Sequence, residues 1–265
     1  MKVMKELMRA IKEYWNQRAH EYDDVPGHGL HSDTEKKAWM TLLNQAIGTT
    51  ENLRVLDAGT GTGVIASLLA EMGHFVIGVD LSENMLSKAK SKVKKTGNSN
   101  PSVEFGNCMV ENLPFKDNSV DVVVSRHLLW ALPEPKKALK EWVRVLRQGG
   151  KVIIIDGNWF YNDTALYSRI RRFFANLLTL ISERRNPWRM DNLSKMKGEL
   201  PLIRRKRPDA DIMMLKELGL EEVEVMPEIE KMTQTWFYRL KHGHWGKSFI
   251  VIGSKGSSLT QLSRK

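Results

Sequence analysis

The sequence has a single cysteine, Cys108, among its 265 residues. One cysteine cannot form an internal disulfide, and it cannot supply a cysteine-based zinc cluster. The chain also lacks an apolar run long enough to span a membrane, and its charged first six residues lack the apolar core of a signal peptide. We therefore expect a soluble, cytoplasmic protein without a metal site.

The sequence also has fewer acidic than basic residues. The chain has 31 aspartates and glutamates against 41 lysines and arginines, which gives a formal net charge of +10. Hydrophobic residues make up 42% of the chain, so a substantial core can form and wholesale disorder is excluded. The length suits one large domain, or one domain with an insertion.

The most informative stretch is residues 55–63, which reads Val-Leu-Asp-Ala-Gly-Thr-Gly-Thr-Gly. Its apolar start indicates the end of a buried strand, and the apolar spacing over 64–72 predicts a helix. Between them, Gly59, Gly61 and Gly63 allow a sharp turn and let a ligand lie against the backbone. The start of the helix would point its free N–H groups at that ligand.

Two acidic residues narrow the choice of ligand. Val64 stands where a dinucleotide-binding turn has its third glycine, and no Gly-Lys-Ser/Thr ending marks a P-loop. Asp57, two residues before the first glycine, would repel a pyrophosphate and suits a cationic amine or sulfonium. Asp80 ends the next apolar strand, where a carboxylate accepts hydrogen bonds from a ribose diol.

These residues and four further blocks, in this order, resemble the class I S-adenosylmethionine-dependent methyltransferases, in their ubiquinone/menaquinone-methyltransferase-like (methyltransferase type 11) branch. The blocks are Gly-Val-Asp-Leu-Ser-Glu-Asn-Met-Leu, Glu-Asn-Leu-Pro-Phe, Ser-Val-Asp-Val-Val-Val-Ser-Arg and Arg-Val-Leu-Arg-Gln-Gly-Gly. The resemblance covers roughly residues 14–156 and implies S-adenosylmethionine as the cofactor. The alternative is a Rossmann-like domain that binds another nucleotide or none.

Strand and helix patterns alternate after the glycine turn, which predicts a parallel sheet with right-handed crossovers. With the resemblance, we expect an α/β fold: a Rossmann-like, seven-stranded methyltransferase sheet, mostly parallel with an antiparallel last strand, and helices on both faces. The expected parts are an N-terminal helical cap (1–50), a cofactor-binding core (51–158), a basic helical insertion (159–208), the C-terminal part of the core (209–254) and a disordered tail (255–265).

The local patterns also place particular elements of this fold. A helix is expected over 135–146, closed by Gly149 and Gly150, before a strand over 151–156. The last two strands are expected over 221–225 and 248–252.

In open sheets of this kind, ligands bind at the carboxyl ends of the strands. The resemblance therefore implies cofactor contacts from the glycine turn, from the residues that follow the strands and from an N-terminal lid. The expected cofactor residues are Tyr22, Asp57, Gly59, Thr60, Gly61, Gly63, Asp80, Leu81, Met109, Val110 and Ser125. Tyr22 would cover the methionine end, with residues 26–31 as the lid hinge; the alternative is an amphipathic helix packed on the domain.

The chain departs from its relatives near the expected adenine site. Where relatives commonly carry an acid that accepts from the adenine amino group, an ungapped alignment places Met109. A thioether is a poor acceptor, so that bond is in doubt. Either the backbone N–H of Val110 contacts the ring while Met109 packs on it, or a shifted alignment brings Asn107 to the site.

Methyl transfer from a sulfonium is an in-line displacement that requires neither a nucleophile nor a metal. A base helps if the acceptor must lose a proton, and His127, which follows the fourth strand, is the candidate. Its alternative role is a polar residue satisfied by the neighbouring backbone. His28 and His31 lie near His20 without a fourth zinc ligand nearby in sequence, so we assign them to the substrate side.

Trp130 and Trp159 are further candidates for the substrate pocket, although large aromatics are equally common in cores. The insertion over 159–208 contains a predicted amphipathic helix over 164–185 with Arg169 on its polar face. Three interpretations stay open: a cover with a solvated outer face, a cover whose arginines receive an anionic substrate, or a surface for nucleic acid or anionic lipid.

We therefore expect a methyltransferase that moves a methyl group to a small-molecule acceptor, anionic or apolar. The alternative is an RNA- or membrane-associated methyltransferase or cofactor-binding protein that uses the basic insertion. Peripheral membrane contact is compatible with the sequence, nucleic acid is less expected, and the oligomeric state is not predicted.

Overall fold

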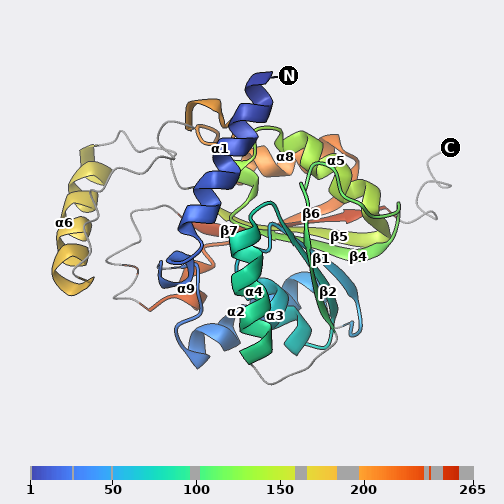
Figure 1. Ribbon diagram of the computed structural model, residues 1–265, viewed down its shortest axis with the longest axis horizontal. Coiled ribbons are helices and arrows are strands. Elements are labelled where there is room, and N and C mark those ends of the chain that lie inside the picture. Colours follow the sequence, from blue (N-terminus) through green and yellow to red (C-terminus); the bar gives the residue numbers. More distant parts are fainter. Residues whose placement is uncertain are drawn as a thin grey trace.

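A seven-stranded sheet lies at the centre of the structure (Figure 1). The computed structural model describes residues 2–25, 27–48, 50–95, 102–158, 166–183, 197–235, 239 and 247–256. The strands are β1 Arg54–Ala58, β2 Phe75–Asp80, β3 Val103–Asn107, β4 Val120–Arg126, β5 Leu146–Gly157, β6 Leu220–Pro227 and β7 Ser248–Lys255. Their order in the sheet is β3-β2-β1-β4-β5-β7-β6.

The sheet is mostly parallel, with one exception. β7 pairs antiparallel with both β5 and β6, whereas the pairs from β3 to β5 are parallel. Antiparallel pairing of the last two strands was expected from the sequence. The predicted fold class is therefore confirmed.

Helices cover both faces of this sheet. Those that the structure describes are α1 Lys2–Arg18, α2 Asp33–Ile47, α3 Val64–Glu71, α4 Glu83–Lys95, α5 Pro135–Val145, α6 Leu166–Glu183, α8 Asp209–Glu217 and α9 Glu230–Thr233. Short 3-10 turns occur at Tyr22–Asp24, Leu129–Ala131 and Lys197–Glu199. Figure 1 shows α5 and α8 on one side of the sheet, with α2 and α3 on the other.

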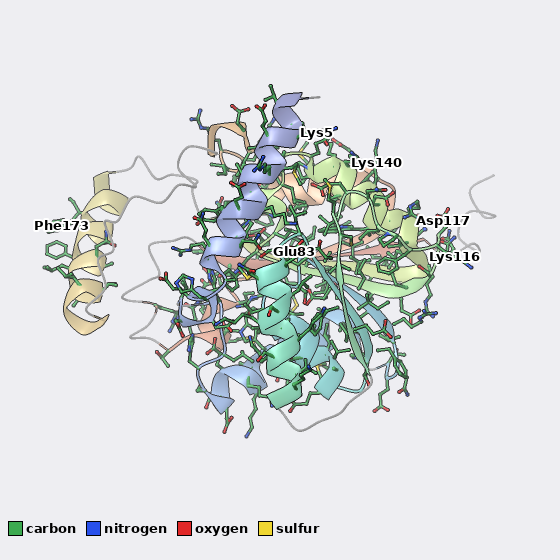
Figure 2. The ribbon with its side chains drawn as sticks, in the orientation of Figure 1. Lys5, Glu83, Lys116, Asp117, Lys140 and Phe173 are labelled. Carbon is green, nitrogen blue, oxygen red and sulfur yellow. The ribbon has the colours of Figure 1, made fainter. Side chains whose placement is uncertain are left out.

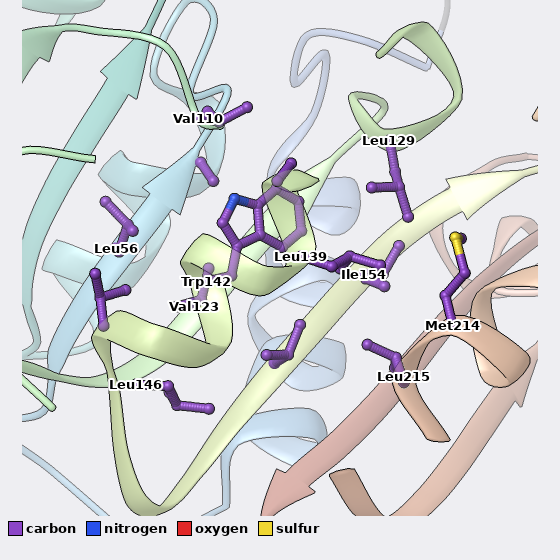
Figure 3. Close-up of a cluster of buried hydrophobic side chains, with 14 of the residues drawn as sticks. Leu56, Val110, Val123, Leu129, Leu139, Trp142, Leu146, Ile154, Met214 and Leu215 are labelled. Atoms are coloured by element: carbon purple, nitrogen blue, oxygen red, sulfur yellow. The ribbon is translucent and has the colours of Figure 1, made fainter. Parts of the chain in front are cut away.

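Neighbouring residues of the central strands point into two different cores. Successive side chains of a strand alternate between faces, so β5 contributes Ile154 to the core under α5 and α8, and Ile153 to the core under α2 and α3. Both faces are buried, which explains why β4 and β5 read as continuous apolar runs rather than as alternating patterns. Figure 3 shows Trp142 of α5 at the centre of the first core, among Leu56, Val123 and Leu139.

The connection from α5 to β5 differs from the sequence prediction. The helix ends at Val145, and the glycines expected to close it lie inside β5 instead. Val120 pairs with Leu146 and Val122 pairs with Lys151, so the register shifts at this point. Close packing explains why Gly150 is required, because a Cβ on it would lie 2.7 Å from the carbonyl oxygen of Asp121.

Two helices lie outside the two layers. α1 packs on α4 and crosses the edge of the sheet where the parallel strands end (Figure 1). α6 stands apart from the sheet and its covering helices. No helix in the described part of the chain is long and apolar enough to cross a membrane.

The first core predicts a specific stability effect. Leu139 is fully buried, and replacing it with alanine should lower the free energy of unfolding by about 2–5 kcal/mol, because apolar contacts are lost and a cavity remains. Met213 of α8 is 62% exposed, so Met213→Ala should change it by no more than about 0.5 kcal/mol. Urea unfolding of both variants measures the difference, and equal effects would contradict the core assignment.

Candidate functional site

A pocket opens at the carboxyl ends of β1, β2 and β4, next to α1. Sequence analysis predicted many of its lining residues. Those predicted residues are Tyr22, Gly59, Gly61, Asp80, Leu81, Met109, Val110 and His127. The pocket is also lined by Met8, Ile11, Lys12, Trp15, Ser82, Met85, Cys108, Glu111, Arg126, Leu128, Ala131, Leu132 and Pro133.

The glycine turn between β1 and α3 forms one wall of this pocket. Gly59 and Gly61 have positive φ angles of 71° and 55°, a conformation that residues with a Cβ rarely adopt. A Cβ on Gly59 would also lie 2.7 Å from Cδ2 of Leu128. At Gly61 the nearest atom to a Cβ would be Cε1 of Tyr22 at 3.9 Å, so the Tyr22 ring lies over the turn.

Asp80 at the end of β2 holds the glycine turn in place. Its carboxylate accepts hydrogen bonds from the backbone N–H of Gly61 (2.9 Å) and from that of Ser82 (2.8 Å). Burial raises the pKa of Asp80, and the backbone hydrogen bonds oppose that rise. A carboxylate has about four lone-pair sites, so Asp80 keeps acceptor capacity in the pocket that it lines.

Asp57 lies behind the turn instead of lining the pocket. It is only 1% exposed, and its Oδ2 accepts from the hydroxyl of Thr60 (2.6 Å) and the backbone N–H of Ala66 (3.1 Å). Burial raises its pKa to about 6. The carboxylate therefore joins the turn to the first turn of α3.

The remaining predicted residues of this wall also act from behind it. Ser125 is buried, and its hydroxyl donates to the carbonyl of Ala58 at 2.9 Å, which ties the end of β4 to β1. A Cβ on Gly63 would lie 2.9 Å from that of Ala89, so this glycine lets α4 approach the turn. These two residues and Thr60 shape the wall without lining the pocket.

The segment after β3 resolves one of the alternatives left open by the sequence. The side-chain amide of Asn107 donates to the carbonyls of Asp80 (2.9 Å) and Leu81 (3.0 Å), so its N–H groups already hold the backbone. Met109 is 38% exposed and lines the pocket together with Val110. The thioether and the Val110 backbone, rather than Asn107, are the groups presented there.

An N-terminal lid, which we define as residues 14–31, closes over the turn. The rings of Tyr22 and His28 stack with centroids 4.4 Å apart, and the centroid of His28 lies 5.4 Å from that of His127. Arg126 donates from its guanidinium to the carbonyls of Gly27 and His28. The lid thus brings the rings of residues 22, 28 and 127 together. These contacts could not be predicted from the sequence.

Two further lid residues hold it in place through polar contacts. Asn16 accepts through its side-chain oxygen from the hydroxyl of Ser82 (2.7 Å) and the backbone N–H of Asn84 (3.3 Å). Asp23 accepts from the hydroxyl of Thr62 (2.5 Å) and forms an ion pair with Lys92 at 2.9 Å. Sequence analysis missed both residues, although each lies in the segment that resembles the start of the family.

The electrostatic setting keeps His28 and His127 neutral. Burial and, next to it, the positive charge of Arg126 lower the pKa of His28 to about 3. Burial also lowers the pKa of His127 well below its usual value, with Arg126 as the next cause. Burial raises the pKa of Tyr22 to about 12, so its hydroxyl stays protonated.

Sequence analysis missed a second buried charge cluster beside this site. Arg207 bonds to Asp156 at the end of β5 (2.6 Å) and to Asp211 of α8 (2.8 Å), and all three are buried. In the sequence, Arg207 is the last residue of a compact basic run over 204–207. The structure instead uses it to anchor the end of the insertion to the core.

His31 and Trp130, two further residues predicted on the substrate side, do not line the pocket. His31 is exposed, and its backbone N–H donates to Glu35 at 2.9 Å. Trp130 packs with Ile11 and Leu200 in a small apolar cluster beside α1. Trp159 and the side chain of Arg169 lie outside the described residues.

The lid contacts lead to a test by hydrogen exchange. Asn16→Ala removes two hydrogen bonds, each worth about 0.5–1.5 kcal/mol, so exchange in residues 14–31 should accelerate roughly tenfold or more. Arg9→Ala is a matched control on the same helix, because Arg9 pairs only with Glu13 among the contacts described for it. Unchanged exchange in Asn16→Ala would show that this contact does not hold the lid.

The neutral state of His28 leads to a pH test. A histidine whose pKa is lowered on folding stabilises the protein fully above about pH 6.5 and loses that contribution as the pH falls toward 3. In His28→Gln, the decline of unfolding free energy between pH 6.5 and 4 should be shallower by up to about 1.4 kcal/mol per pH unit. His20→Gln, at an exposed histidine, serves as the control, and parallel curves for wild type and His28→Gln would contradict the burial argument.

Comparison with known proteins supports the expected family. Residues 56–154 match the family model described as "Methyltransferase domain". A demethylmenaquinone methyltransferase of Renibacterium salmoninarum is 34% identical over 140 residues, covering 51% of this chain and 56% of that protein. A demethylmenaquinone methyltransferase of Bacillus cereus is 31% identical over 201 residues, covering 72% of this chain and 79% of that protein.

Other relatives are matched over shorter stretches. A phosphatidylethanolamine N-methyltransferase of Cereibacter sphaeroides is 34% identical over 122 residues, covering 46% of this chain and 58% of that protein. The chain spans 46–58% of the length of four of the curated relatives that it matches.

Solved structures share the fold at low identity. A SAM-dependent methyltransferase of Aquifex aeolicus has a TM-score of 0.58 at 20% identity, covering 91% of this chain and 98% of that one. The cyclase SpnF has a TM-score of 0.64 at 17% identity, covering 95% of this chain and 97% of that one. With the Bacillus cereus relative matched over most of its length, the family is clear. The chain belongs to the class I S-adenosylmethionine-dependent methyltransferases, in their ubiquinone/menaquinone-methyltransferase-like branch.

Proposed function

We propose that this chain transfers a methyl group from S-adenosylmethionine to a lipophilic small-molecule acceptor in the pocket beneath the lid. One observation carries the proposal: Gly59, Gly61 and Asp80 line the same pocket, and Tyr22 lies over the glycine turn. The chain also belongs to a family of methyltransferases.

The pocket residues fit the parts of this cofactor. Asp80 lines the pocket, and its carboxylate oxygens are acceptors that suit the hydroxyl groups of a ribose. Leu81, Met109 and Val110 offer an apolar surface to an adenine ring. Gly61 and Tyr22 lie next to each other in the pocket lining, and we assign the methionine end of the cofactor to them.

The chain contributes mainly alignment and exclusion of water. When bound, the cofactor supplies a methyl group on a sulfonium, which is already a good leaving group. Tyr22 and His28, held by the lid contacts, close the site above the glycine turn. Holding two reactants in line can lower the barrier by roughly 7–11 kcal/mol, so no covalent catalysis by the protein is required.

The acceptor side of the pocket is apolar. Met8, Ile11 and Trp15 of α1 line it, together with Leu128 and the segment Ala131–Pro133. The named acceptors of two relatives, a demethylmenaquinone and a phosphatidylethanolamine, are both lipophilic molecules. Both facts favour an apolar acceptor over the anionic one that the sequence also allowed.

We assign His127 the role of accepting a proton from the acceptor. Its φ is 56°, an uncommon conformation for a residue with a side chain, and its backbone N–H donates to the carbonyl of Ile155 at 2.9 Å. Such conformations concentrate at functional sites. The lowered pKa keeps the ring neutral and therefore able to accept a proton, but it also makes the ring a weaker base, which suits an acceptor with an acidic proton such as a phenol.

Other substrate-side residues remain part of the proposal in less direct roles. His28 orients Tyr22 and faces His127, while Trp130 packs against α1, whose side chains line the acceptor pocket. We keep the division into a cap (1–50), a core (51–158 with 209–254) and an insertion (159–208). In it the cap closes the pocket, and Leu200 and Ile203 of the insertion pack beside Ile11 of α1.

The competing proposal is a cofactor-binding protein without methyl transfer. The likeness to SpnF, a cyclase by its name, shows that this fold does not by itself determine the reaction. Incubation with labelled S-adenosylmethionine and demethylmenaquinone in detergent separates the two. Transfer of the labelled methyl group to the quinone supports our proposal. If the protein binds S-adenosylhomocysteine but transfers no label to the quinone or to phosphatidylethanolamine, the competing proposal is supported.

Gly61→Val tests the location of the cofactor site. Valine at a φ of 55° is strained, and its side chain would project toward Tyr22, so affinity for S-adenosylhomocysteine should fall at least tenfold in calorimetry. Gly73→Val introduces similar strain at a φ of 90° with no atom within 4 Å of the Cβ, and it lies outside the pocket lining. If both variants lose affinity equally, strain rather than the pocket is responsible.

A further inference from the structure

Helix α6 presents a continuous apolar face to solvent. Phe173 is 57% exposed and Phe174 59%. The other large apolar residues that are at least 38% exposed on this helix are Ile170, Leu177, Leu178 and Leu180. Single exposed apolar residues are ordinary on protein surfaces, but six within eleven positions form a patch that marks an interaction site.

The buried positions of α6 lie on its other side. Ala175 and Thr179 are each only 2% exposed, and they are one helical turn apart. With 3.6 residues per turn, position 175 lies roughly opposite positions 173 and 177. A helix on a globular domain normally turns its apolar face to the core, so α6 is oriented the opposite way.

No other described element covers this apolar face. α6 has no extensive packing contact with the helices and strands that the structure describes, and Figure 1 shows it apart from them. Figure 2 shows the Phe173 ring on the side of α6 that faces away from the sheet. The face is therefore available to a partner outside the chain.

The charge of the surrounding sequence indicates which partner. Residues 159–208 contain twelve lysines and arginines against four acids, a formal net charge of +8 out of +10 for the chain. Three of these arginines, Arg169, Arg171 and Arg172, belong to the sequence of α6 itself. An apolar helix face within a strongly basic segment is the composition of helices that lie on anionic membranes.

We propose that α6 docks this protein onto an anionic lipid bilayer. In this arrangement Phe173, Phe174 and Leu177 enter the boundary between headgroups and acyl chains, and the net positive charge of the segment attracts the anionic headgroups. The helix has 18 residues and does not qualify as a membrane span, so it lies in the plane of the surface. Docking goes beyond the proposed methyl transfer and does not depend on it.

Two other partners fit these observations less well. A nucleic acid would use the arginines but would leave the phenylalanine and leucine face in water. A second copy of this chain would bury that face but would bring two segments of +8 together, and like charges repel.

Flotation with vesicles tests the proposal. The full chain should bind vesicles of phosphatidylcholine and phosphatidylglycerol at least tenfold more strongly than vesicles of phosphatidylcholine alone, with the difference shrinking in high salt. The double variant Phe173→Ser, Leu177→Ser should lose at least tenfold in binding to the mixed vesicles. Phe75→Ser is the matched control, since Phe75 is 53% exposed on β2, and it should bind like wild type.

Calorimetry with S-adenosylhomocysteine on the same samples checks the cofactor site separately, so failure of docking and failure of the proposed function are distinguishable. Absence of wild-type binding to mixed vesicles, or equal binding by the double variant, would overturn the proposal. So would a wild-type dimer that the double variant converts to a monomer. Tight single-stranded RNA binding without vesicle binding would favour nucleic acid instead.

Discussion

The carboxylate of Asp80 is the contact on which the rest of the site depends. By accepting from the N–H groups of Gly61 and Ser82, it joins the turn after β1 to the start of α4. The lid is fastened to the neighbours of this joint, through Asn16 on Ser82 and Asp23 on Thr62. One buried carboxylate thus organises both the wall of the pocket and the surface that the lid closes on.

Arg126 has a comparable role on the opposite side of the pocket. Its guanidinium donates to two lid carbonyls and lies 4.4 Å above the ring of Trp39, so it holds the lid near α2. The same positive charge adds to burial in keeping His28 and His127 neutral. Arg126 therefore both holds the lid and helps to set the protonation state of the two histidines.

The insertion combines a fixed end with an outward-facing helix. Arg207 is held between Asp156 and Asp211, so the chain returns to the core at a defined point. α6 is not packed in this way, and its apolar residues are exposed. If the acceptor is lipophilic, as proposed, docking of α6 on a lipid surface would bring the protein to the place where such a molecule dissolves.

The sequence alone determined the fold class, the family and the position of the glycine turn, because these depend on residues close together in the chain. An acid, alternating glycines and a second acid at the next strand end specify a local geometry that few other patterns share. The same local patterns placed the end of α5 to within one residue but misplaced the start of β5, because packing of Gly150 against Asp121, rather than helix capping, decides where the glycines lie.

Only the tertiary structure decided which side chains face the pocket. Asp57 and Asp80 look alike in sequence, yet one braces the turn from behind and the other lines the pocket. The contacts of Asn16 and Arg126 join residues 66 and 98 positions apart, so no local pattern could reveal them. Helical spacing showed which residues of α6 share a face, but its direction depends on what packs beside the helix, and that is a property of the folded molecule.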